Sequence, residues 1–546
     1  MAISLISIEQ VKAQSTSRKI EIQSDGSITD TNPLTPIQQN GNVYTFTGDI
    51  QGRIDIRKSN IILDGAGYSL KKGDLDFAVI VGTSLEVPET FGVDGITIRN
   101  LEIVGFDYGI TLGGQNNIVS NVNITEGPDY NGVPIWVSGS NHIIQGCRIT
   151  GNKGYGMLIH AKGAVISDNY IADNGNFGIT FEDNAAVLRN NKLNNNGFGP
   201  FHMDEMSMRN PGQPFQIASN EIDASNMVDG KPVCYWVGEH DKTVPSSAGY
   251  VVLDNCTNIS VKNLSVNRDS TGYYSRGAYS VSLIRTRNSA VSNNTLNGTG
   301  IYISYSTQDI VIENNSITIG GIYSYGYNIS IIGNSVLASK DTGVTLSGTG
   351  NAVVAKNILS QCGTGISKEG ISKGRIIQNT ITNCDIGISI FSSDNNGFYR
   401  NNFINNKQQV SEQHYALQWP LDTYYQSFNN TWDNNFWSNY NGADANSDGI
   451  GDTSYDIFEN YTDYHPSMAL FAIDSEISDL QDLINPSPMP TPSSPLSSPS
   501  SSENVDASET IPEFLPTVPI LAALASALLI VSVSLILYFK KKMQSA

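Results

Sequence analysis

Three short stretches in the second half of the chain decide the fold: VAKNIL (residues 354–359), IIQNTI (376–381) and FYRNNF (398–403). Each contains an asparagine two residues before an apolar residue, and these asparagines, Asn357, Asn379 and Asn401, follow one another at intervals of 22 residues. The same pattern recurs, at intervals of 19 to 23 residues within each run, at Asn169, Asn191, Asn294, Asn315 and Asn334. A repeat of this length predicts a solenoid in which each repeat forms one coil.

Each repeat reads as a short strand, a turn that carries the asparagine, a second short strand, a glycine-containing turn and a third strand. The third strand is represented by FGITFE (177–182), TGVTLSG (342–348) and IGISIF (386–391), in which apolar and polar residues alternate. Such strands bury one face, and we expect each to pair with the equivalent strand of the next repeat. The pattern predicts an all-β protein, a right-handed parallel β-helix, because the leucine-rich consensus is missing and a β-propeller needs about twice the period.

The recurrent asparagines have a structural explanation. At a turn where the backbone leaves the sheet, an amide side chain offers a donor and an acceptor to unpaired backbone groups and to the asparagine one coil away. Two cysteine pairs, Cys234 with Cys256 and Cys362 with Cys384, are also 22 residues apart. We expect stacked buried thiols at both pairs, because neighbouring parallel strands seldom present disulfide geometry, although an extracellular location leaves the disulfide as an alternative.

The two ends of the chain predict its location. Residues 518–539 carry no charge and are long enough to cross a membrane as a helix. Three lysines follow at 540–542, and because such lysines stay cytoplasmic, the preceding residues are expected outside the cell. Residues 1–14 resemble the remnant of a secretory signal peptide.

These features give an order of segments along the chain. We expect the signal-peptide remnant at 1–14, an N-terminal cap at 15–53, the β-helix at 54–410 with an interruption at 205–250, a C-terminal cap at 411–470, a Pro/Ser-rich linker at 471–517, the transmembrane helix at 518–539 and a cytoplasmic tail at 540–546. The caps are expected because an exposed terminal coil would pair with other chains.

Composition narrows the class of partner. The chain has a formal net charge of -20 and only 32 lysines and arginines, so it offers no basic surface for nucleic acid. Divalent cations are a more natural partner for such a chain. Ten Asn-x-Ser/Thr sequons are compatible with a glycosylated surface protein.

The stretch NGADANSDGIGDTSYD (441–456) predicts a calcium site in the C-terminal cap. Its ligands would be the side chains of Asp444, Asn446, Asp448 and Asp452 and the carbonyl oxygen of Ile450. Alternate residues of a tight loop point oxygens at one centre, as Ca²⁺ requires, while Gly449 permits the sharp turn. An EF-hand would carry glutamate where this chain has Tyr455, so we expect a structural clasp, and an Asx-turn loop without metal is the alternative.

Three separated stretches resemble the NosD-like family of right-handed parallel β-helix (PbH1 repeat) proteins of archaeal cell surfaces. They are FTGDIQGRIDIRKSNIILDGAGYSL (46–70), residues 229–264 beginning DGKPVCYWVGEHDKT, and residues 434–468 beginning NNFWSNYNGADANSDG. The resemblance implies the same fold. The family takes its name from a periplasmic factor involved in copper supply, and its coils also occur in carbohydrate-binding and sugar-cleaving proteins, so fold alone does not imply function.

Two groups of residues near the interruption are candidate sites. His160, Glu182 and Asp204 follow one another at intervals of 22 residues, so we expect them on one face, suited to acid–base chemistry on a glycan or to holding a cation. A solvated face that contacts sugar, with Trp136 nearby, is the alternative. The segment with His202, Met203, Met206 and Met208 offers donors that suit Cu(I), a match to the family name, although methionine is also a common filler of apolar gaps.

The stretch YWVGEHDKTVP (235–245) is expected on a loop extruded from the solenoid, where Tyr235, Trp236 and Glu239 would contact a sugar. A structural insertion is the alternative. The sequence thus predicts a membrane-anchored extracellular β-helix that binds or organises surface polysaccharide or a surface-layer protein, clasped by calcium. A carbohydrate-active lyase or hydrolase and a copper-binding accessory protein are the rival functions.

Overall fold

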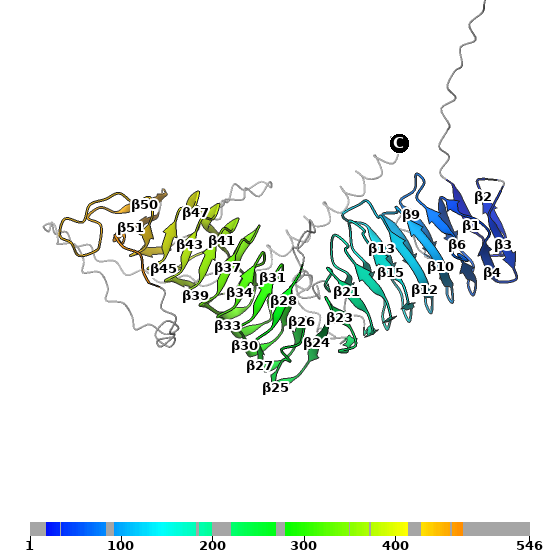
Figure 1. The fold of residues 1–546 in the computed structure, drawn as a ribbon, viewed down its shortest axis with the longest axis horizontal. Helices are drawn as coiled ribbons and strands as arrows, with labels where there is room; N and C mark the ends of the chain where they lie inside the picture. The colour runs from blue at the N-terminus through cyan, green and yellow to red at the C-terminus, as the bar shows by residue number, and fades with distance from the viewer. Residues whose placement is uncertain are drawn as a thin grey trace, which may run out of the picture. The chain divides into compact units, whose positions relative to one another are not determined.

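The computed structural model describes residues 18–32, 34–82, 92–181, 185–198, 220–268, 279–348, 350–370, 373–412, 427, 429–458 and 461–472. The chain divides into two compact units, Met1–Pro486 and Ser487–Ala546, and every described residue belongs to the first. These residues form short strands, with no helix among them. Parallel pairing from coil to coil confirms the predicted β-helix (Figure 1).

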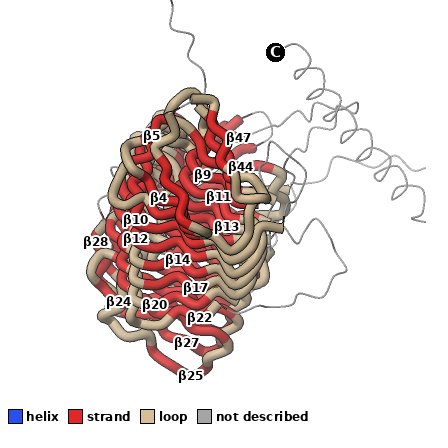
Figure 2. The backbone as a smooth tube through the Cα atoms, turned by 90° about the vertical axis from the view of Figure 1, so that its right-hand side faces the viewer, coloured by secondary structure: helices blue, strands red, loops and turns tan. Residues whose placement is uncertain are grey.

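The first series of coils precedes residue 230 and has three faces (Figure 2). One face comprises β1 (Lys19–Ile22), β6 (Arg53–Ile56), β9 (Phe77–Val81), β11 (Tyr108–Leu112), β13 (Val133–Val137), β16 (Met157–Ile159) and β19 (Ile179–Phe181). The second comprises β4 (Val43–Phe46), β7 (Ile62–Asp64), β10 (Thr97–Val104), β12 (Ile118–Thr125), β14 (Ile143–Gln145), β17 (Val165–Ser167), β20 (Val187–Arg189) and β22 (Glu221–Ile222). The third comprises β5 (Ile50–Gln51), β8 (Ser69–Lys71), the far ends of β10 and β12, β15 (Arg148–Thr150), β18 (Tyr170–Ala172), β21 (Lys192–Asn194) and β23 (Met227–Val228).

The second series has the same three-faced arrangement. Its first face comprises β24 (Lys231–Val237), β26 (Tyr250–Asp254), β29 (Val281–Ile284), β32 (Ile301–Ile303), β35 (Ile322–Ser324), β38 (Thr342–Ser347), β41 (Thr364–Glu369), β44 (Ile386–Phe391) and β47 (Gln408–Glu412). The second comprises β25 (His240–Thr243), β27 (Thr257–Lys262), β30 (Arg287–Ser292), β33 (Gln308–Glu313), β36 (Tyr327–Ile332), β39 (Val353–Ala355), β42 (Arg375–Ile377), β45 (Gly397–Tyr399) and β48 (Thr431–Asp433). The third comprises β28 (Ser265–Asn267), β31 (Thr295–Asn297), β34 (Ser316–Thr318), β37 (Ser335–Leu337), β40 (Ile358–Ser360), β43 (Thr380–Thr382), β46 (Asn402–Ile404) and β49 (Phe436–Trp437).

Ladders of buried asparagines run through both series, as the repeat predicts. In the second series the ladder passes through Asn294, Asn315, Asn334, Asn357, Asn379, Asn401 and Asn435. Each Nδ2 up to that of Asn401 donates to the Oδ1 of the next asparagine at 2.8–3.0 Å, and the Nδ2 of Asn435 donates to Asp463 Oδ2. Each also donates to a main-chain carbonyl of the preceding coil, as Asn379 does to Val354. Because every amide is satisfied on both sides, burying this polar column costs little.

The cysteines separate into two cases. Cys362 and Cys384 occupy equivalent positions in neighbouring coils, since Ser360 pairs with Thr382, and both are free and buried, which confirms the expected stacked thiols. The same prediction is wrong for Cys234, which pairs in register with Val251 and not with Cys256. The coil between them is shorter than 22 residues, so equal spacing in sequence does not give equal position there.

Both ends of the solenoid extend beyond the sequence-based boundaries. β1 pairs in parallel with β6, so coil pairing begins at Lys19, and the cap consists of β2 (Ile28–Asp30) and β3 (Ile37–Asn40), which pair antiparallel with β1 and β4. At the other end β48 and β49 form a further coil after β47. The antiparallel hairpin of β50 (Tyr455–Phe458) and β51 (Tyr461–Asp463) then closes the stack. The first coil lacks the asparagine pattern, which explains why the sequence does not reveal it.

The two series are joined where the sequence suggests an interruption. β22 and β23 continue the first series, and β23 pairs antiparallel with β24. The ring of Tyr250 contacts that of Phe198 at a centroid distance of 5.4 Å, and its hydroxyl donates to the Phe198 carbonyl at 3.0 Å. Val233, Tyr250 and Val252 therefore belong to the core of the first series. Hydrophobic packing thus continues across the change.

Candidate functional site

An aromatic strip, defined by Phe77, Tyr108, Trp136 and His160, crosses successive coils of the face formed by β9, β11, β13 and β16. Phe77 and Tyr108 pair in register, and their rings stack with centroids 4.6 Å apart and planes 12° apart. The ring of Trp136 lies 6.2 Å from Tyr108 and 6.1 Å from His160. Trp136 points away from the core because Ile135 and Val137, on either side of it, are fully buried. Tyr108, Trp136 and His160 are half-buried and expose part of their rings along the coils, whereas Phe77 is buried.

Charged groups lie beside the Tyr108 end of the strip. Lys72 Nζ is 2.6 Å from Asp107 Oδ2 and 3.0 Å from Asp76 Oδ1. Burial raises the pKa of Asp107, and the neighbouring Asp76 carboxyl adds to the increase, whereas the hydrogen bond from Lys72 lowers the pKa of Asp76. Two carboxyl groups whose pKa values move apart are suited to separate acid and base roles. The same residues form an ion-pair network around Lys72, in which Asp107 Oδ1 is buried without a hydrogen-bond partner in the described part of the chain.

The predicted ladder of His160, Glu182 and Asp204 is only partly described. His160 follows β16, is half-buried, and its main-chain amide donates to Val137 at 2.7 Å. It lies against Trp136, as expected. Glu182 and Asp204 lie outside the described residues, as do the four copper candidates His202, Met203, Met206 and Met208. The sequence missed Phe77 and Tyr108, although both stand at the first position of an apolar strand and one coil apart.

The prediction of an extruded loop at residues 235–245 is wrong. Tyr235 and Trp236 lie within β24, pairing in register with Val252 and Leu253. His240 begins β25. The segment stays in the coil because its alternating apolar residues complete a parallel pairing. Lys242 Nζ lies 5.7 Å from the Trp236 ring centroid and forms an ion pair with Glu239. Trp236 and Glu239 are half-buried, whereas Lys242 is exposed.

The Asp-rich loop folds as a chain of side-chain to main-chain hydrogen bonds. Asp444 accepts the amides of Asp448 at 3.1 Å and Gly449 at 3.0 Å, Asp448 Oδ1 accepts the Ile450 amide at 2.9 Å, and Asp452 Oδ2 accepts the Ala445 amide at 2.8 Å. Asn446 donates to Asp448 Oδ2 at 2.9 Å. Gly449 has φ +86°, the left-handed conformation the turn requires. The side-chain oxygens of Asp444, Asn446, Asp448 and Asp452 thus accept hydrogen bonds from main-chain amides of the same loop.

The loop is fastened to the last coil. The Gly451 amide donates to Pro466 O and the Met468 amide to Gly449 O, both at 2.9 Å. The Ser467 amide in turn donates to Asn435 O at 2.9 Å, which connects the loop to the asparagine ladder. The loop therefore lies where a clasp would act.

Within the described ranges, which include the Asp-rich loop, no three His, Cys, Asp or Glu side chains are grouped closely enough to hold a metal ion. All five cysteines are buried, and His142 is hydrogen-bonded in the core to Asn117 and Ser138. These residues do not fit a copper site. Nor does the described part of the chain contain a helix long and apolar enough to span a membrane; residues 518–539 lie outside it.

A polar groove of about 430 Å³ opens on the other side of the first series. It is lined by Asn100, Glu102, Asn121 and Arg148 among others. Asn121 donates to Asn100 at 2.7 Å, Glu102 accepts from Ser69 at 2.5 Å, and the Arg148 guanidinium lies 4.4 Å from the Tyr170 ring centroid. Asn123, which also lines the groove, has a buried Oδ1 without a hydrogen-bond partner among the described residues. The groove lacks a row of aromatic rings, so we take the aromatic strip as the stronger candidate for a sugar contact.

Comparisons with known proteins agree with the architecture. Residues 81–211 match the family described as "Right handed beta helix region", and residues 216–442 match the family described as "Periplasmic copper-binding protein (NosD)". A comparison with curated proteins finds no match.

Several solved structures are similar at low scores. The Dettilon tailspike protein is 15% identical with a TM-score of 0.20, and the alignment covers 66% of this chain but only 62% of the tailspike. The A-module of the Azotobacter vinelandii mannuronan C-5 epimerase AlgE6 is 13% identical with a TM-score of 0.22, covering 71% and 88% of the two chains. A mannuronic acid specific polysaccharide family 6 lyase from human gut microbiota is 11% identical with a TM-score of 0.26, covering 72% and 79%.

At these scores the solved structures assign no site and no activity to this chain. The two family matches instead follow one another along the chain and between them span most of both series of coils. With the coil-to-coil pairing described above, they identify the chain as a right-handed parallel β-helix protein that is similar to the NosD family over residues 216–442.

Proposed function

We propose that this protein is a membrane-anchored extracellular β-helix that binds or organises surface polysaccharide, with the aromatic strip as its contact surface. Residues 518–539 would be the anchor, residues 471–517 the stalk, and the calcium loop a structural clasp. A surface-layer protein is the alternative partner.

The observation that carries the proposal is the aromatic strip. Aromatic faces stack on the apolar faces of sugar rings, and an extended chain of sugars can follow successive coils spaced about 4.8 Å apart. Trp136 is half-buried and fixed between core residues, so little conformational entropy is lost on binding. Lys72, Asp76 and Asp107 add polar groups at one end of the strip.

Replacing Trp136 with Ala should weaken polysaccharide binding by about tenfold, because one stacking surface near the middle of the strip is lost. The measurement is affinity electrophoresis of the full chain in gels containing alginate, polygalacturonate or laminarin. Tyr68→Ala is the matched control, since Tyr68 is 39% exposed and lies outside the strip. Equal binding by wild type and Trp136→Ala, with equal melting temperatures, would reject the strip as the contact surface.

A carbohydrate-active lyase or hydrolase is the rival function. It would use His160, Glu182 and Asp204, or the Asp76 and Asp107 carboxyl groups beside the strip. Release of reducing ends or unsaturated products from the same polysaccharides separates the two: an enzyme releases them, and a binding protein releases none.

Calcium should stabilise the C-terminal cap. An ion that binds only the folded chain stabilises it by about 3 kcal/mol when present at one hundred times its dissociation constant. EDTA should therefore lower the melting temperature of wild type and leave polysaccharide binding unchanged. Asp448→Ala should melt at the same temperature with and without calcium, while Asp385→Ala, a change at an exposed ion pair on another coil, should keep the calcium response. A wild-type melting temperature that ignores both calcium and EDTA would contradict the clasp.

Copper binding is a second candidate, favoured by the printed name of the family matched at residues 216–442. Its donors would be His202, Met203, Met206 and Met208, which precede the matched range. An anaerobic Cu(I) titration against a competing chelator tests this function. A Cu(I) site that is present in wild type and lost in the double variant Met203→Ala, Met206→Ala supports copper binding. A wild type that does not compete with the chelator for Cu(I) excludes it.

A further inference from the structure

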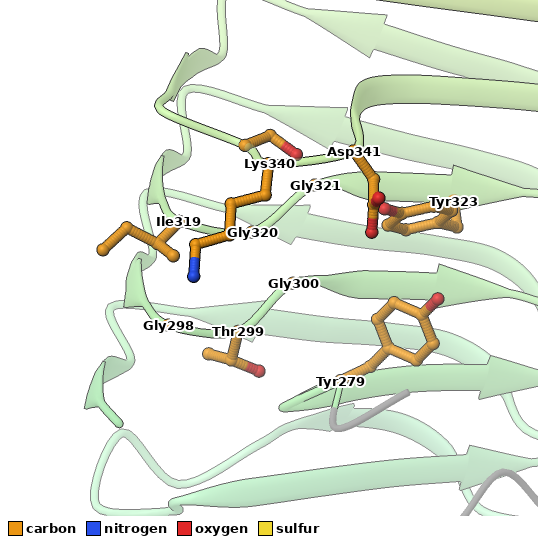
Figure 3. Close-up of a pocket in the computed structure, with 11 residues that line it drawn as sticks. Tyr279, Gly298, Thr299, Gly300, Ile319, Gly320, Gly321, Tyr323, Lys340 and Asp341 are labelled. Carbon is orange, nitrogen blue, oxygen red and sulfur yellow. The ribbon is translucent and has the colours of Figure 1, made fainter. Parts of the chain in front are cut away.

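A second hollow lies in the second series of coils, at the turns that lead into β32, β35 and β38 (Figure 3). Its floor is main chain, because Gly300, Gly320 and Gly321 follow one another across adjacent coils. A methyl group added to Gly320 would collide with Thr299 O, and one added to Gly321 with Thr342 O. Stacking of the coils therefore demands these glycines. Gly320 is half-buried, whereas Gly300 and Gly321 are buried, so main chain reaches the surface of the hollow mainly around Gly320.

Two tyrosine rings, those of Tyr279 and Tyr323, line this hollow, and three further tyrosines continue the group beside them. Tyr302 and Tyr323 pair in register and point outward, since Ile301 and Ile303 on either side of Tyr302 are fully buried. Tyr279 stacks on Tyr302 with ring centroids 5.2 Å apart and lies 5.3 Å from Tyr323. Tyr325 extends the group, 5.9 Å from Tyr302 and 4.6 Å from Tyr305. The five rings, here called the tyrosine cluster, are half-buried and come from adjacent coils.

The rim carries one charge of each sign. Figure 3 shows Lys340 on the side opposite the rings of Tyr279 and Tyr323, with Asp341 beside Tyr323. Lys340 and Asp341 are both exposed. The enclosed volume is about 40 Å³, room for a few water molecules and too small to engulf a sugar. A ligand would therefore lie over the rings and the glycine floor as an extended surface chain.

We infer that the tyrosine cluster and the glycine floor bind a neutral saccharide chain. The tyrosine rings supply faces for stacking, and their hydroxyl groups supply hydrogen-bond donors and acceptors. A sugar ring has matching features, an apolar face and several hydroxyl groups. Neutral character follows from charge: Lys340 and Asp341 cancel locally, and a chain with a net charge of -20 repels polyuronates. The inference extends the proposed glycan binding to a second site made of different residues.

The test compares laminarin, a neutral glucan, with alginate, using isothermal titration of the full chain and its variants. Tyr302→Ala and Tyr323→Ala should each weaken laminarin binding about tenfold, and the phenylalanine variants, which keep the ring, should lose less. Lys340→Ala, an exposed change that leaves the core intact, should weaken it about threefold. Tyr327→Ala is the matched control, because Tyr327 is 47% exposed in the same coil but on β36.

The outcomes separate this site from the aromatic strip. Laminarin binding that is lost in Tyr323→Ala and retained in Trp136→Ala supports the tyrosine cluster as a site of its own. Laminarin binding that survives all the tyrosine and Lys340 changes, or tighter binding of alginate that depends on Lys340, would overturn the inference even if the strip binds polysaccharide. If wild type binds neither polymer in the titration nor any polymer in affinity gels, the proposed function fails together with this inference.

Discussion

Replacing Lys368 with Met should make the protein more stable at pH 7, by up to about 5 kcal/mol. Lys368 lies in β41, where it pairs in register with Leu346 and Ile390, two residues of the solenoid core, and it is itself fully buried. Its ammonium group has one partner within the described chain, Asn396 Oδ1 at 2.6 Å. Burial lowers the pKa of Lys368 to about 7.

The direction of the pH dependence follows from proton binding. Below about pH 7 both the folded and the unfolded chain carry the protonated amine, and the cost of burying it is constant. Between pH 7 and the ordinary pKa of 10.5, the unfolded chain holds a proton that the folded chain has lost, so stability rises with pH. The shift of about 3.5 pKa units corresponds to about 5 kcal/mol over this window.

The difference in free energy of unfolding between wild type and Lys368→Met isolates the contribution of the Lys368 amine, because all other titratable groups are the same in both proteins. Urea unfolding at pH 6.5 and at pH 10 should show a large stabilisation by Met at the lower pH and little at the higher. Asn396 Oδ1 still accepts the Gly374 amide at 2.8 Å, so the substitution does not leave this oxygen without a hydrogen-bond partner. Lys340→Met, at an exposed site, is the control and should change stability little at either pH. A stability difference that does not vary with pH would contradict a depressed pKa.

Replacing Asp463 with Ala should destabilise the C-terminal cap by about 3–5 kcal/mol. Asp463 is fully buried and terminates the asparagine ladder. Its carboxylate accepts five N–H groups at 2.9–3.2 Å: the amides of Asn434, Asn435 and His465, the side-chain amide of Asn435 and the indole of Trp437. Removing the acceptor leaves several buried donors without partners.

Thermal unfolding followed by circular dichroism, in EDTA so that calcium does not contribute, measures the loss. Asp463→Asn retains one carbonyl oxygen and should lose less. Asp456→Asn is the matched control, since Asp456 lies exposed in the same hairpin. Equal melting temperatures for Asp463→Ala and Asp456→Asn would show that the ladder does not need this terminus.

The solenoid was predictable because its signals are local. Asn379, in IIQNTI (residues 376–381), marks a turn of its own coil. The asparagine at the equivalent position of the next coil, Asn401, is its hydrogen-bond partner. Cys362 and Cys384 were predicted correctly for the same reason, as their coil has the regular length. The prediction for Cys234 and Cys256 is wrong because the shorter coil between them changes the register without a local signal.

The candidate sites were harder to predict from the sequence than the fold was. Trp136 and His160 lie together as expected, but Phe77 and Tyr108 complete their strip from preceding coils of different length. The tyrosine cluster has a weak signal in the 21-residue interval from Tyr302 to Tyr323. Without the register of the strands, that interval does not show that Tyr279 and Tyr325 join them.

By itself, the sequence determined that this is a β-helix, that asparagines hold its coils together and that an acidic loop follows the last repeats. Only the tertiary structure decided that Lys368 points into the core, into space left by Gly374, and that Asp463 ends a ladder whose last asparagine lies 28 residues earlier. The physical reason is that stacking repeats a local pattern, whereas the neighbours of a side chain across coils depend on the lengths of intervening turns. Those lengths vary, and the residues of a turn do not show which residues of the neighbouring coils will align with the strand that follows the turn.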